Sequence, residues 1–365
     1  MDEFASIRHW TDGRESEEWQ RQRGVILGIG DDAALLDLTV PIEELTGPRE
    51  LIMAMDTMVE TVHFNEWTMA DEDIGHKALA ANISDIAAMG GLPMHALVSV
   101  SVPKSYGPER MRRLYDGLYA CAERYGVAVV GGDTTSSPQH LVVAVTVTGT
   151  VEAGKALRRS GAKPGDAVVL TGPVGMSAAG LHLLLAQQAD AASAELEAAS
   201  AAEQHSMQLL RAHRRPAPSV RAGRLLLTRG TCHSLTDVSD GLASEAWEIA
   251  EASELSVTLW DQSLPRSGSM TAYANRVGVD PLEWMLYGGE DYVMLGTMDA
   301  ADATATQAAF HAEGLPFYII GVTEAGIPRV ELVKNLASVT HEEEEAGTEM
   351  ETQRVQIAKL GYNHF

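Results

Sequence analysis

Short apolar segments that alternate with two amphipathic helical segments constrain the first half of the chain most strongly. Apolar runs of this length, with β-branched residues and period-two alternation, predict strands. Apolar residues at helical spacing, closed by glycines, predict helices. The predicted strands are 51–55, 96–102, 127–130 and 141–151, and the predicted helices are 72–90 and 108–126. This pattern predicts an α+β domain with both helices on one face of a sheet.

The length of 365 residues predicts two domains. A loop-rich segment, AGKALRRSGAKPGD, follows the last of these strands, so we expect one domain over 1–151 and another over 152–365. The second half also mixes helical segments with strands, the last at 317–323, and it predicts a second α+β domain. The helical region over 176–213 includes an Ala/Glu-rich stretch, 187–205, which we interpret as a solvated insertion.

The charge balance excludes some classes of partner. Lysine and arginine number 27 against 51 aspartates and glutamates, a formal net charge of −24. Such a chain lacks the clustered cations that bind nucleic acid, and an anionic membrane surface repels it. No apolar run is long enough to span a bilayer, and Cys121 and Cys232 fit no disulfide framework or zinc spacing. We therefore expect a cytoplasmic protein that binds neither nucleic acid nor membrane.

Aspartates recur where a predicted strand or a glycine turn ends. They are Asp32 after GIG, Asp56 after LIMAM, Asp133 after VAVVGG, and Asp237 and Asp240 around VSDGL. Asp85 differs, because it lies inside an alanine-rich helix where an unpaired carboxylate would be costly. A turn or a helix cap explains any one of them, and we expect Ser239-Asp240 to cap the helix that follows. Six together, without cations beside them, predict one crevice in which Mg²⁺ ions relieve the repulsion.

Several magnesium ions in one site usually indicate a polyphosphate, because Mg²⁺ completes its octahedron with phosphate oxygens. The chain has neither the P-loop signature nor the H-R-D and D-F-G motifs of protein kinases. Arg158, Arg159 and Lys163 could contact phosphates or belong to a solvated loop. His63 could be a packed histidine, GGEDY only a turn before a strand, and Tyr362 a tail residue packed on the core.

Eight segments, in order along residues 28–365, resemble the thiamine-monophosphate kinase family, which belongs to the superfamily of aminoimidazole ribonucleotide synthetase. They are GIGDDAALL, MDTMVETVHF, HKALAANISDIAAMGGLP, VVGGDTT, ALRRSGAKPGD, TDVSDGL, YGGEDY and GYNHF. NISDIAAMG and GGDTT are shared more loosely by the superfamily. Their combination with VHF, RSGAKPGD, GGEDY and the aromatic tail is specific to the thiamine-monophosphate kinases.

The resemblance implies a two-domain aminoimidazole ribonucleotide synthetase-like fold. It also implies a homodimer in which N-terminal strands of both copies form a barrel-like core. It also implies transfer of the ATP γ-phosphoryl group to thiamine monophosphate by direct in-line attack, with several Mg²⁺ ions. Since an ionised phosphate oxygen is already a nucleophile, no general base is expected. Catalysis then depends on positioning and charge neutralisation, with Arg159 in support.

Motif matches to the family also imply which residues bind each ligand. Those implied for Mg²⁺ are Asp32, Asp56, Asp85, Asp133, Asp237 and Asp240. Those implied for ATP are Tyr115, Gly132, Asp133, Arg159 and Ser239. Those implied for the thiamine side are His63, Glu290 and Tyr362, of which Tyr362 could stack on the thiazolium and Glu290 could offset its charge.

Four residues, in three motifs, depart from the family pattern. Ala54-Met55 stand where the family commonly has Ser-Thr, Thr61 stands where Gly often precedes V-H-F, and Ser136 stands where Arg commonly follows G-G-D-T-T. The hydroxyl contacts that Ser-Thr could give a metal are therefore lost. These changes affect individual ligands rather than the reaction.

Other members of the superfamily are the nearest alternatives, beginning with aminoimidazole ribonucleotide synthetase itself. Selenophosphate synthetase is disfavoured because residues 1–30 contain no cysteine, and the carbamoyl-dehydrating hydrogenase maturation protein because the chain ends in Phe365 rather than Cys. A non-catalytic acidic module that binds Ca²⁺ is disfavoured because no D-x-[DN]-x-[DN]-G loop occurs.

Overall fold

The computed structural model describes residues 9–29, 33–43, 45, 47–190, 200–336 and 351–361. The chain packs into two compact units. Unit 1 comprises Met1–Ala156 and Ser177–Arg224, and unit 2 comprises Leu157–Met176 and Leu225–Phe365. Helix α7 (Val220–Arg229) contributes residues to both units. The domain boundary predicted between residues 151 and 152 stays a prediction.

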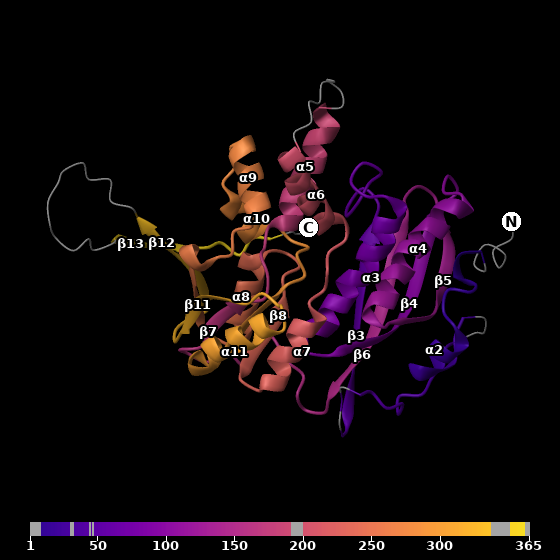
Figure 1. Ribbon diagram of the computed structural model, residues 1–365, viewed down its shortest axis with the longest axis horizontal. Coiled ribbons are helices and arrows are strands. Elements are labelled where there is room, and N and C mark those ends of the chain that lie inside the picture. Colours follow the sequence, from indigo (N-terminus) through magenta and orange to yellow (C-terminus); the bar gives the residue numbers. More distant parts are fainter. Residues whose placement is uncertain are drawn as a thin grey trace. The chain divides into compact units, whose positions relative to one another are not determined.

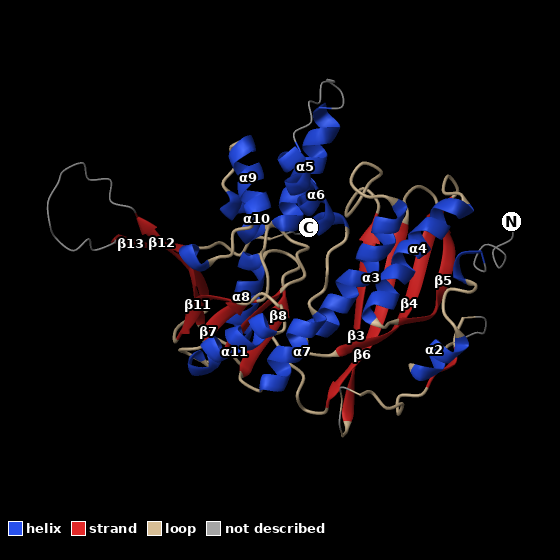
Figure 2. Ribbon diagram, viewed as in Figure 1, coloured by secondary structure: helices blue, strands red, loops and turns tan. Residues whose placement is uncertain are grey.

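The centre of unit 1 is a sheet of four described strands in the order β3-β6-β4-β5. They are β3 (Arg49–Val59), β4 (Leu92–Pro103), β5 (Ala128–Ser137) and β6 (Val142–Glu152). Strand β6 pairs antiparallel with both of its neighbours, whereas β4 and β5 are parallel. Helices α3 (Asp71–Ala88) and α4 (Pro108–Tyr125) lie side by side over one face of this sheet (Figures 1 and 2). The predicted α+β arrangement, with two helices on one face, is confirmed.

Aliphatic side chains close the covered face. Ile83 and Ile86 of α3 and Val143 and Val145 of β6 have no exposed surface. Because side chains alternate along a strand, every second residue of β6 enters this core. The alternation in LVVAVTVTGTV predicted this strand.

The opposite face of the sheet is only partly covered. Near β5, a segment with α2 (Glu17–Gln22), β1 (Val25–Leu27) and β2 (Leu35–Leu36) packs on it, with Val25 against Ala128 and Val130. On β3 and β4, four large apolar side chains remain exposed, which we call the open sheet face: Leu51 (52%), Met53 (64%), Met55 (62%) and Leu97 (45%). An exposed apolar patch of this kind commonly marks an interaction surface.

Two further helices, α5 (Met176–Asp190) and α6 (Ser200–Arg214), account for the long helical region predicted over 176–213. Much of the Ala/Glu-rich stretch lies outside the described residues. Ser177 of α5 and His213 of α6 are both buried, and the hydroxyl oxygen of Ser177 lies 3.1 Å from Nδ1 of His213. This hydrogen bond links the two helices in the interior of unit 1.

Unit 2 contains a sheet of seven described strands in the order β13-β12-β9-β11-β7-β10-β8. The strands are β7 (Ala167–Leu170), β8 (Cys232–Asp237), β9 (Ser256–Trp260), β10 (Met294–Met298), β11 (Tyr318–Glu324), β12 (Arg329–Leu336) and β13 (Glu351–Gln356). Neighbouring strands are antiparallel except β12 and β9, which are parallel. The predicted second α+β domain is confirmed in its class.

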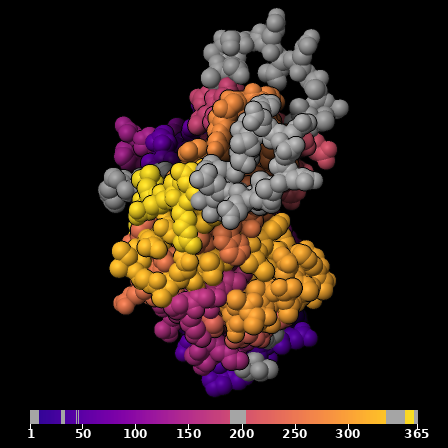
Figure 3. All heavy atoms as spheres, turned by 90° about the vertical axis from the view of Figure 1, so that its left-hand side faces the viewer, coloured from indigo at the N-terminus to yellow at the C-terminus, as the bar shows by residue number. Residues whose placement is uncertain are grey.

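The described helices of unit 2 are α8 (Leu242–Ala252), α9 (Gly268–Val277), α10 (Pro281–Tyr287) and α11 (Ala300–Ala312), with a short 3₁₀ helix, η1 (Asp261–Ser263). Helix α8 packs on strands β8, β9, β10 and β12. On the side shown in Figure 3, the orange and yellow C-terminal part of the chain forms most of the coloured surface of unit 2. Among the described helices of either unit, none combines the length and apolar character needed to cross a bilayer.

Candidate functional site

Helix α3, which is described throughout, is buried along almost its whole length. Its only residues that are not buried are Glu72 and Asp85. Asp85 is half-buried, so part of its carboxylate keeps its hydration and the desolvation cost of a buried charge is reduced. Asp85 is thus partly accessible to solvent on a helix that is otherwise almost fully buried.

Asp56 lies inside β3 rather than at its end. The prediction that the strand stops at Asp56 is wrong, because β3 continues to Val59 and pairs with β6 throughout. Among the described strands β3 is an edge strand, so alternate N–H groups point away from β6. The N–H of Asp56 donates to Oδ1 of Asn82 at 2.9 Å. Asn82 is fully buried one turn before Asp85, so it joins the strand that carries Asp56 to the helix that carries Asp85.

Asp133 is also inside a strand. The strand predicted over 127–130 is too short, because β5 continues to Ser137 by pairing with β4. A Cβ atom at Gly132 would lie 1.8 Å from the carbonyl oxygen of Val98 on β4, so only glycine permits this pairing. Asp133, which is exposed, directly follows this glycine.

The register of the sheet separates Asp56 from Asp133. Asp56, Val145, Val98 and Gly132 lie opposite one another across the four strands, and residues directly opposite share a face of the sheet. Val145 and Val98 are buried on the side that α3 covers. Asp133 is the next residue, so it faces the other side. Three steps between strands separate the two aspartates by about 14 Å within one copy of the chain.

The loop after β3 holds His63. The backbone N–H of Val59 donates to its Nδ1 at 3.0 Å, so a neutral ring carries its proton on Nε2. Thr61, at the position where the family often has glycine, has a φ of 70°. That region is disfavoured for β-branched residues, and the loop keeps it through the 2.7 Å hydrogen bond from the N–H of Thr61 to the carbonyl oxygen of Phe64.

Tyr115 lies in the core of unit 1. It is 4% exposed and stacks on Trp10 with ring centroids 5.9 Å apart. Burial raises the pKa of its hydroxyl above the usual range. This is the environment of a core aromatic residue, and the implied contact with ATP stays a prediction.

In unit 2, β8 ends at Asp237 and a short turn leads to α8. The prediction that Ser239 and Asp240 cap this helix is wrong, because Gly241 occupies the N-cap position. The backbone N–H of Asp240 instead lies 3.4 Å from Oε1 of Glu245, inside the helix.

The GGEDY segment packs against this turn. The N–H of Glu290 donates to the carbonyl oxygen of Ser239 at 2.7 Å, and that of Tyr292 to the carbonyl oxygen of Val238 at 2.9 Å. A Cβ atom at Gly289 would lie 2.2 Å from the same Ser239 oxygen, which requires glycine. The segment therefore does more than precede strand β10, because it brings Glu290 to Ser239.

Arg159 reaches the same part of unit 2 from the RRSGAK loop. Its Nε donates to Oγ1 of Thr236 at 3.3 Å, and its Nη1 lies 3.5 Å from a carboxylate oxygen of Glu248 on α8. The structure thus gathers Arg159, Ser239, Asp240 and the end of β8 around the N-terminal turns of α8.

Glu245 is the residue of this cluster that sequence reasoning missed. It is 2% exposed, and burial, followed by the charge of Asp237, raises its pKa to about 7. The sequence did carry a signal, because Glu245 occupies the apolar stripe of α8 between Leu242 and Ile249. An acidic residue at helical spacing from two buried aliphatics marks a buried carboxylate.

Two implied site residues, Asp32 and Tyr362, lie outside the described residues. Gly361, which precedes Tyr362, does belong to them. A Cβ atom at Gly361 would lie 2.7 Å from the carbonyl oxygen of Asp240. The described end of the chain therefore reaches the turn that carries Ser239 and Asp240.

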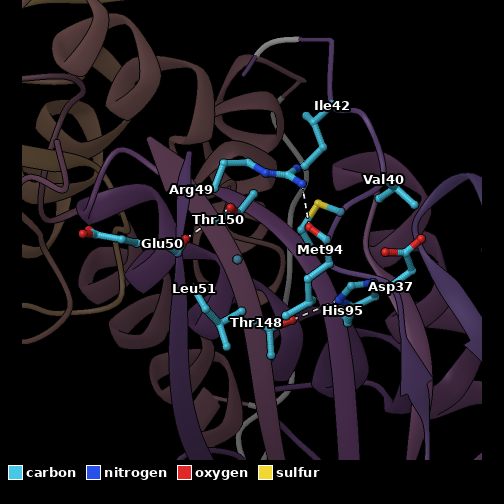
Figure 4. A pocket seen from close by; sticks show the side chains of 12 residues that line it. Asp37, Val40, Ile42, Arg49, Glu50, Leu51, Met94, His95, Thr148 and Thr150 are labelled. Atoms are coloured by element: carbon cyan, nitrogen blue, oxygen red, sulfur yellow. Dashed lines mark hydrogen bonds between the residues drawn. The ribbon is translucent and has the colours of Figure 1, made fainter. Parts of the chain in front are cut away.

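A cavity of about 140 Å³ lies in unit 1. Figure 4 shows it between the 37–42 segment and strands β3, β4 and β6, with His95 and Thr148 joined by a hydrogen bond of 3.1 Å. None of its lining residues belongs to the set that the motifs imply.

Comparison with known proteins decides the family. Sequence profiles described as AIR synthase related protein match residues 30–151, as the N-terminal domain, and residues 163–332, as the C-terminal domain. The thiamine-monophosphate kinase of Bacillus subtilis is 39% identical over 368 residues, covering 100% of both chains. This chain belongs to the thiamine-monophosphate kinase family.

Two solved structures of the family are similar to it. The thiamine-monophosphate kinase of Stenotrophomonas maltophilia has a TM-score of 0.74 at 32% identity, and the match covers 88% of this chain and 96% of that one. AaThiL complexed with AMPPCP and TMP has a TM-score of 0.68 at 30% identity, over 78% of this chain and 84% of that one.

The aspartates that the thiamine-monophosphate kinase motifs single out are divided between the units. Asp56, Asp85 and Asp133 belong to unit 1, and Asp237 and Asp240 to unit 2. Within the described part of the chain, no three or more carboxylate, imidazole or thiolate groups converge as a closed metal site. The donor set nevertheless suits a hard cation, because it consists of carboxylates.

Proposed function

We propose that this chain transfers the γ-phosphoryl group of ATP to thiamine monophosphate, giving ADP and thiamine diphosphate. The observation that carries the proposal is the cluster in unit 2, where four separated motifs of the thiamine-monophosphate kinases meet. The RRSGAK segment, the GGEDY segment and Gly361, the first residue of GYNHF, all contact β8, the VSDGL turn that follows it, or helix α8. Membership in the family and the AMPPCP and TMP bound by AaThiL support the same reaction.

The reaction requires two anions to approach each other. A phosphate oxygen of thiamine monophosphate forms a bond to the γ-phosphorus of ATP, and the bond to the β–γ bridging oxygen breaks with ADP as the leaving group. The guanidinium of Arg159 neutralises part of the phosphate charge. Glu290 and Tyr362 would hold the thiamine moiety, and His63 would present Nε2–H toward the substrate.

We infer that several Mg²⁺ ions accompany ATP. Asp32, Asp56, Asp85, Asp133, Asp237 and Asp240 would hold them. When bound, such ions neutralise phosphate charge and orient the phosphate oxygens. Gly132 and Ser239 would contribute backbone and hydroxyl groups to the nucleotide, and Tyr115 an aromatic contact.

We further propose that the chain acts as a homodimer in which the open sheet faces of two copies pack together. Leu51, Met53, Met55 and Leu97 would then be buried. Val98 and Gly132 are opposite each other and share the covered face. Leu97 is next to Val98 and Asp133 is next to Gly132, so both face the open side. Helix α3, which carries Asp85, covers the opposite face of the sheet in the same copy. A second copy would therefore complete the surroundings of Asp133.

We place the protein in the cytoplasm. ATP is available there, and both cysteines, Cys121 and Cys232, are free thiols, which suits a reducing compartment.

The test of the reaction is ADP release by the purified protein with ATP and Mg²⁺. Thiamine monophosphate, thiamine and formylglycinamidine ribonucleotide are supplied in parallel. We expect release only with thiamine monophosphate, together with thiamine diphosphate in equal amount. Release only with the ribonucleotide would assign the chain to the ring-closing synthetases instead.

A further inference from the structure

We propose that Glu245 is the positioning residue of the phosphate-binding half of the site: it holds the Ser239-Asp240 turn directly and the side chain of Arg159 through Thr236. The proposal rests on the proposed function, because it assigns Arg159 and Ser239 to ATP. In this proposal Glu245 acts only through these protein groups and not by contact with a substrate.

The contacts of Glu245 run to both parts of the cluster. Its Oε1 lies 3.3 Å from the hydroxyl of Ser239 and 3.4 Å from the backbone nitrogen of Asp240. Its Oε2 lies 3.4 Å from Oγ1 of Thr236. Each partner is a donor, and a carboxylate is an acceptor at both oxygens. One buried side chain therefore links both the turn and the last residues of β8 to α8.

Thr236 extends this arrangement to Arg159. Its Oγ1 accepts from Nε of Arg159 at 3.3 Å. The single proton of this hydroxyl has two acceptors at 3.4 Å, the carboxylate of Glu245 and the carbonyl oxygen of Asp237. The carboxylate is the stronger acceptor, so Thr236 donates to Glu245 and keeps a lone pair for Arg159.

Burial argues that this carboxylate is present for positioning rather than for stability. Glu245 is 2% exposed, and its neighbours on the same stripe of α8, Leu242 and Ile249, are 0% and 1% exposed. A leucine at this position would bury apolar area without the desolvation cost of a charge. A carboxylate is needed if three donors around the turn must be held in one geometry.

Glu248 provides the second contact of Arg159 from the same helix. One of its oxygens lies 3.5 Å from Nη1 of Arg159, and the other lies 3.1 Å from Nζ of Lys359. These side chains are exposed to a third or more, and such pairs hold geometry weakly. The buried route through Glu245 and Thr236 therefore dominates the position of Arg159.

The experiment compares Glu245→Gln, Glu245→Asp and Glu254→Gln in the full chain. Glutamine keeps the shape but replaces one acceptor with a donor that faces other donors. Glu254 is exposed at the end of α8 and is the matched control. For Glu245→Gln we expect the KM for ATP, and the Kd for AMPPCP with Mg²⁺, to rise about tenfold or more. The KM for thiamine monophosphate and the melting temperature are expected to stay near wild type.

Rescue and coupling separate positioning from a general structural role. Glu245→Asp, which keeps the carboxylate, is expected to recover part of the lost affinity for AMPPCP. Thr236→Val removes the relay, so its effect on the Kd for AMPPCP should be much smaller in the Glu245→Gln background than in wild type. Unchanged AMPPCP binding in Glu245→Gln, or additive effects of the two substitutions, overturns the proposal. The proposal is also overturned if Glu245→Gln raises the KM for ATP and the KM for thiamine monophosphate equally and lowers the melting temperature.

The two proposals fail in different ways. If the wild-type protein binds AMPPCP but releases no ADP with thiamine monophosphate, the proposed reaction is wrong. The AMPPCP measurements on the variants then still decide the role of Glu245.

Discussion

The side-chain oxygen Oδ1 of Asn82 accepts a hydrogen bond of 2.9 Å from the backbone N–H of Asp56. The same side chain donates through Nδ2 to the carbonyl oxygen of Ala78 at 3.0 Å. Asn82 has no exposed surface, so both hydrogen bonds are made in the core. One buried amide thus satisfies an edge-strand donor and fixes the distance between the strand of Asp56 and the helix of Asp85.

Asn82→Ala is expected to destabilise the fold by about 2–3 kcal/mol, because it leaves the Asp56 N–H unsatisfied and opens a small cavity. Denaturant unfolding followed by circular dichroism measures this. Asn275→Ala, on the exposed side of α9, should change the free energy of unfolding by only a few tenths of a kcal/mol. Similar values for both variants would mean that the amide does not hold β3.

Asp133→Asn should lower kcat by about 100-fold or more, because an amide is a poor Mg²⁺ ligand and the charge that holds the ion is lost. Asp133 is exposed, so the melting temperature should stay within about 2 °C of wild type. ADP release and thermal unfolding are measured on the same preparation. Asp12→Asn, another exposed aspartate of unit 1, serves as the control. Wild-type turnover by the Asp133 variant would remove this residue from the metal site.

Thr61→Gly is expected to stabilise the protein by about 0.5–1 kcal/mol. A β-branched residue at a φ of 70° is strained by roughly 1–3 kcal/mol, and this relief exceeds the added chain entropy of glycine. Thr304→Gly on the exposed face of α11 has no such strain, so it should destabilise. Chemical denaturation compares the two. A less stable Thr61→Gly protein would show that the loop around His63 needs the threonine side chain.

We expect the stability of the fold to depend on pH through His213. Burial, and then the charges of Lys77 and Arg214, lower its pKa from 6.5 to about 2. Below pH 6.5 the unfolded chain binds a proton that the folded chain does not. The contribution is therefore complete above pH 6.5, and it is lost as the pH falls below that value, by about 1.4 kcal/mol per pH unit.

Between pH 7.5 and pH 5, the free energy of unfolding should fall less for His213→Gln than for wild type. The slope of that free energy against pH should be smaller by the equivalent of about one proton. Burial also lowers the pKa of His76 and His95, so part of the slope remains in the variant. His140→Gln, at an exposed position, should keep the wild-type slope. Urea unfolding at a series of pH values gives these slopes, and parallel curves for wild type and His213→Gln would contradict the assignment.

Met55→Asp should convert a dimer into a monomer, because it places a charge among the apolar side chains of the open sheet face, where Met55 is 62% exposed. Sedimentation velocity measures the change. Met207→Asp on α6, where the side chain is 61% exposed, adds the same charge away from the open sheet face and should leave the sedimentation coefficient unchanged. A monomeric wild-type protein would contradict the proposed dimer directly.

Local patterns in the sequence predicted the helices of unit 1 well. Helices predicted over 72–90 and 108–126 are α3 (Asp71–Ala88) and α4 (Pro108–Tyr125), because spacing and end signals such as Pro108 act within a few residues. Strand ends were predicted less well. Asp56 and Asp133 were predicted to follow the ends of their strands. Pairing with β6 and β4 carries β3 and β5 beyond them, and no local signal reports a pairing partner.

The chain by itself therefore determined the fold class, the two sheet-and-helix halves, the family and the identity of the acidic residues, because periodicity and motif spacing are written along the backbone. Only the tertiary structure decided that Asn82 joins Asp56 to the helix of Asp85, that sheet register turns Asp133 to the open face, and that Gly241 rather than Asp240 caps α8. It also decided that Glu245 lies beneath the Ser239-Asp240 turn. The physical reason is that hydrogen-bond partners and burial depend on residues far apart in sequence, which only the packed chain brings together.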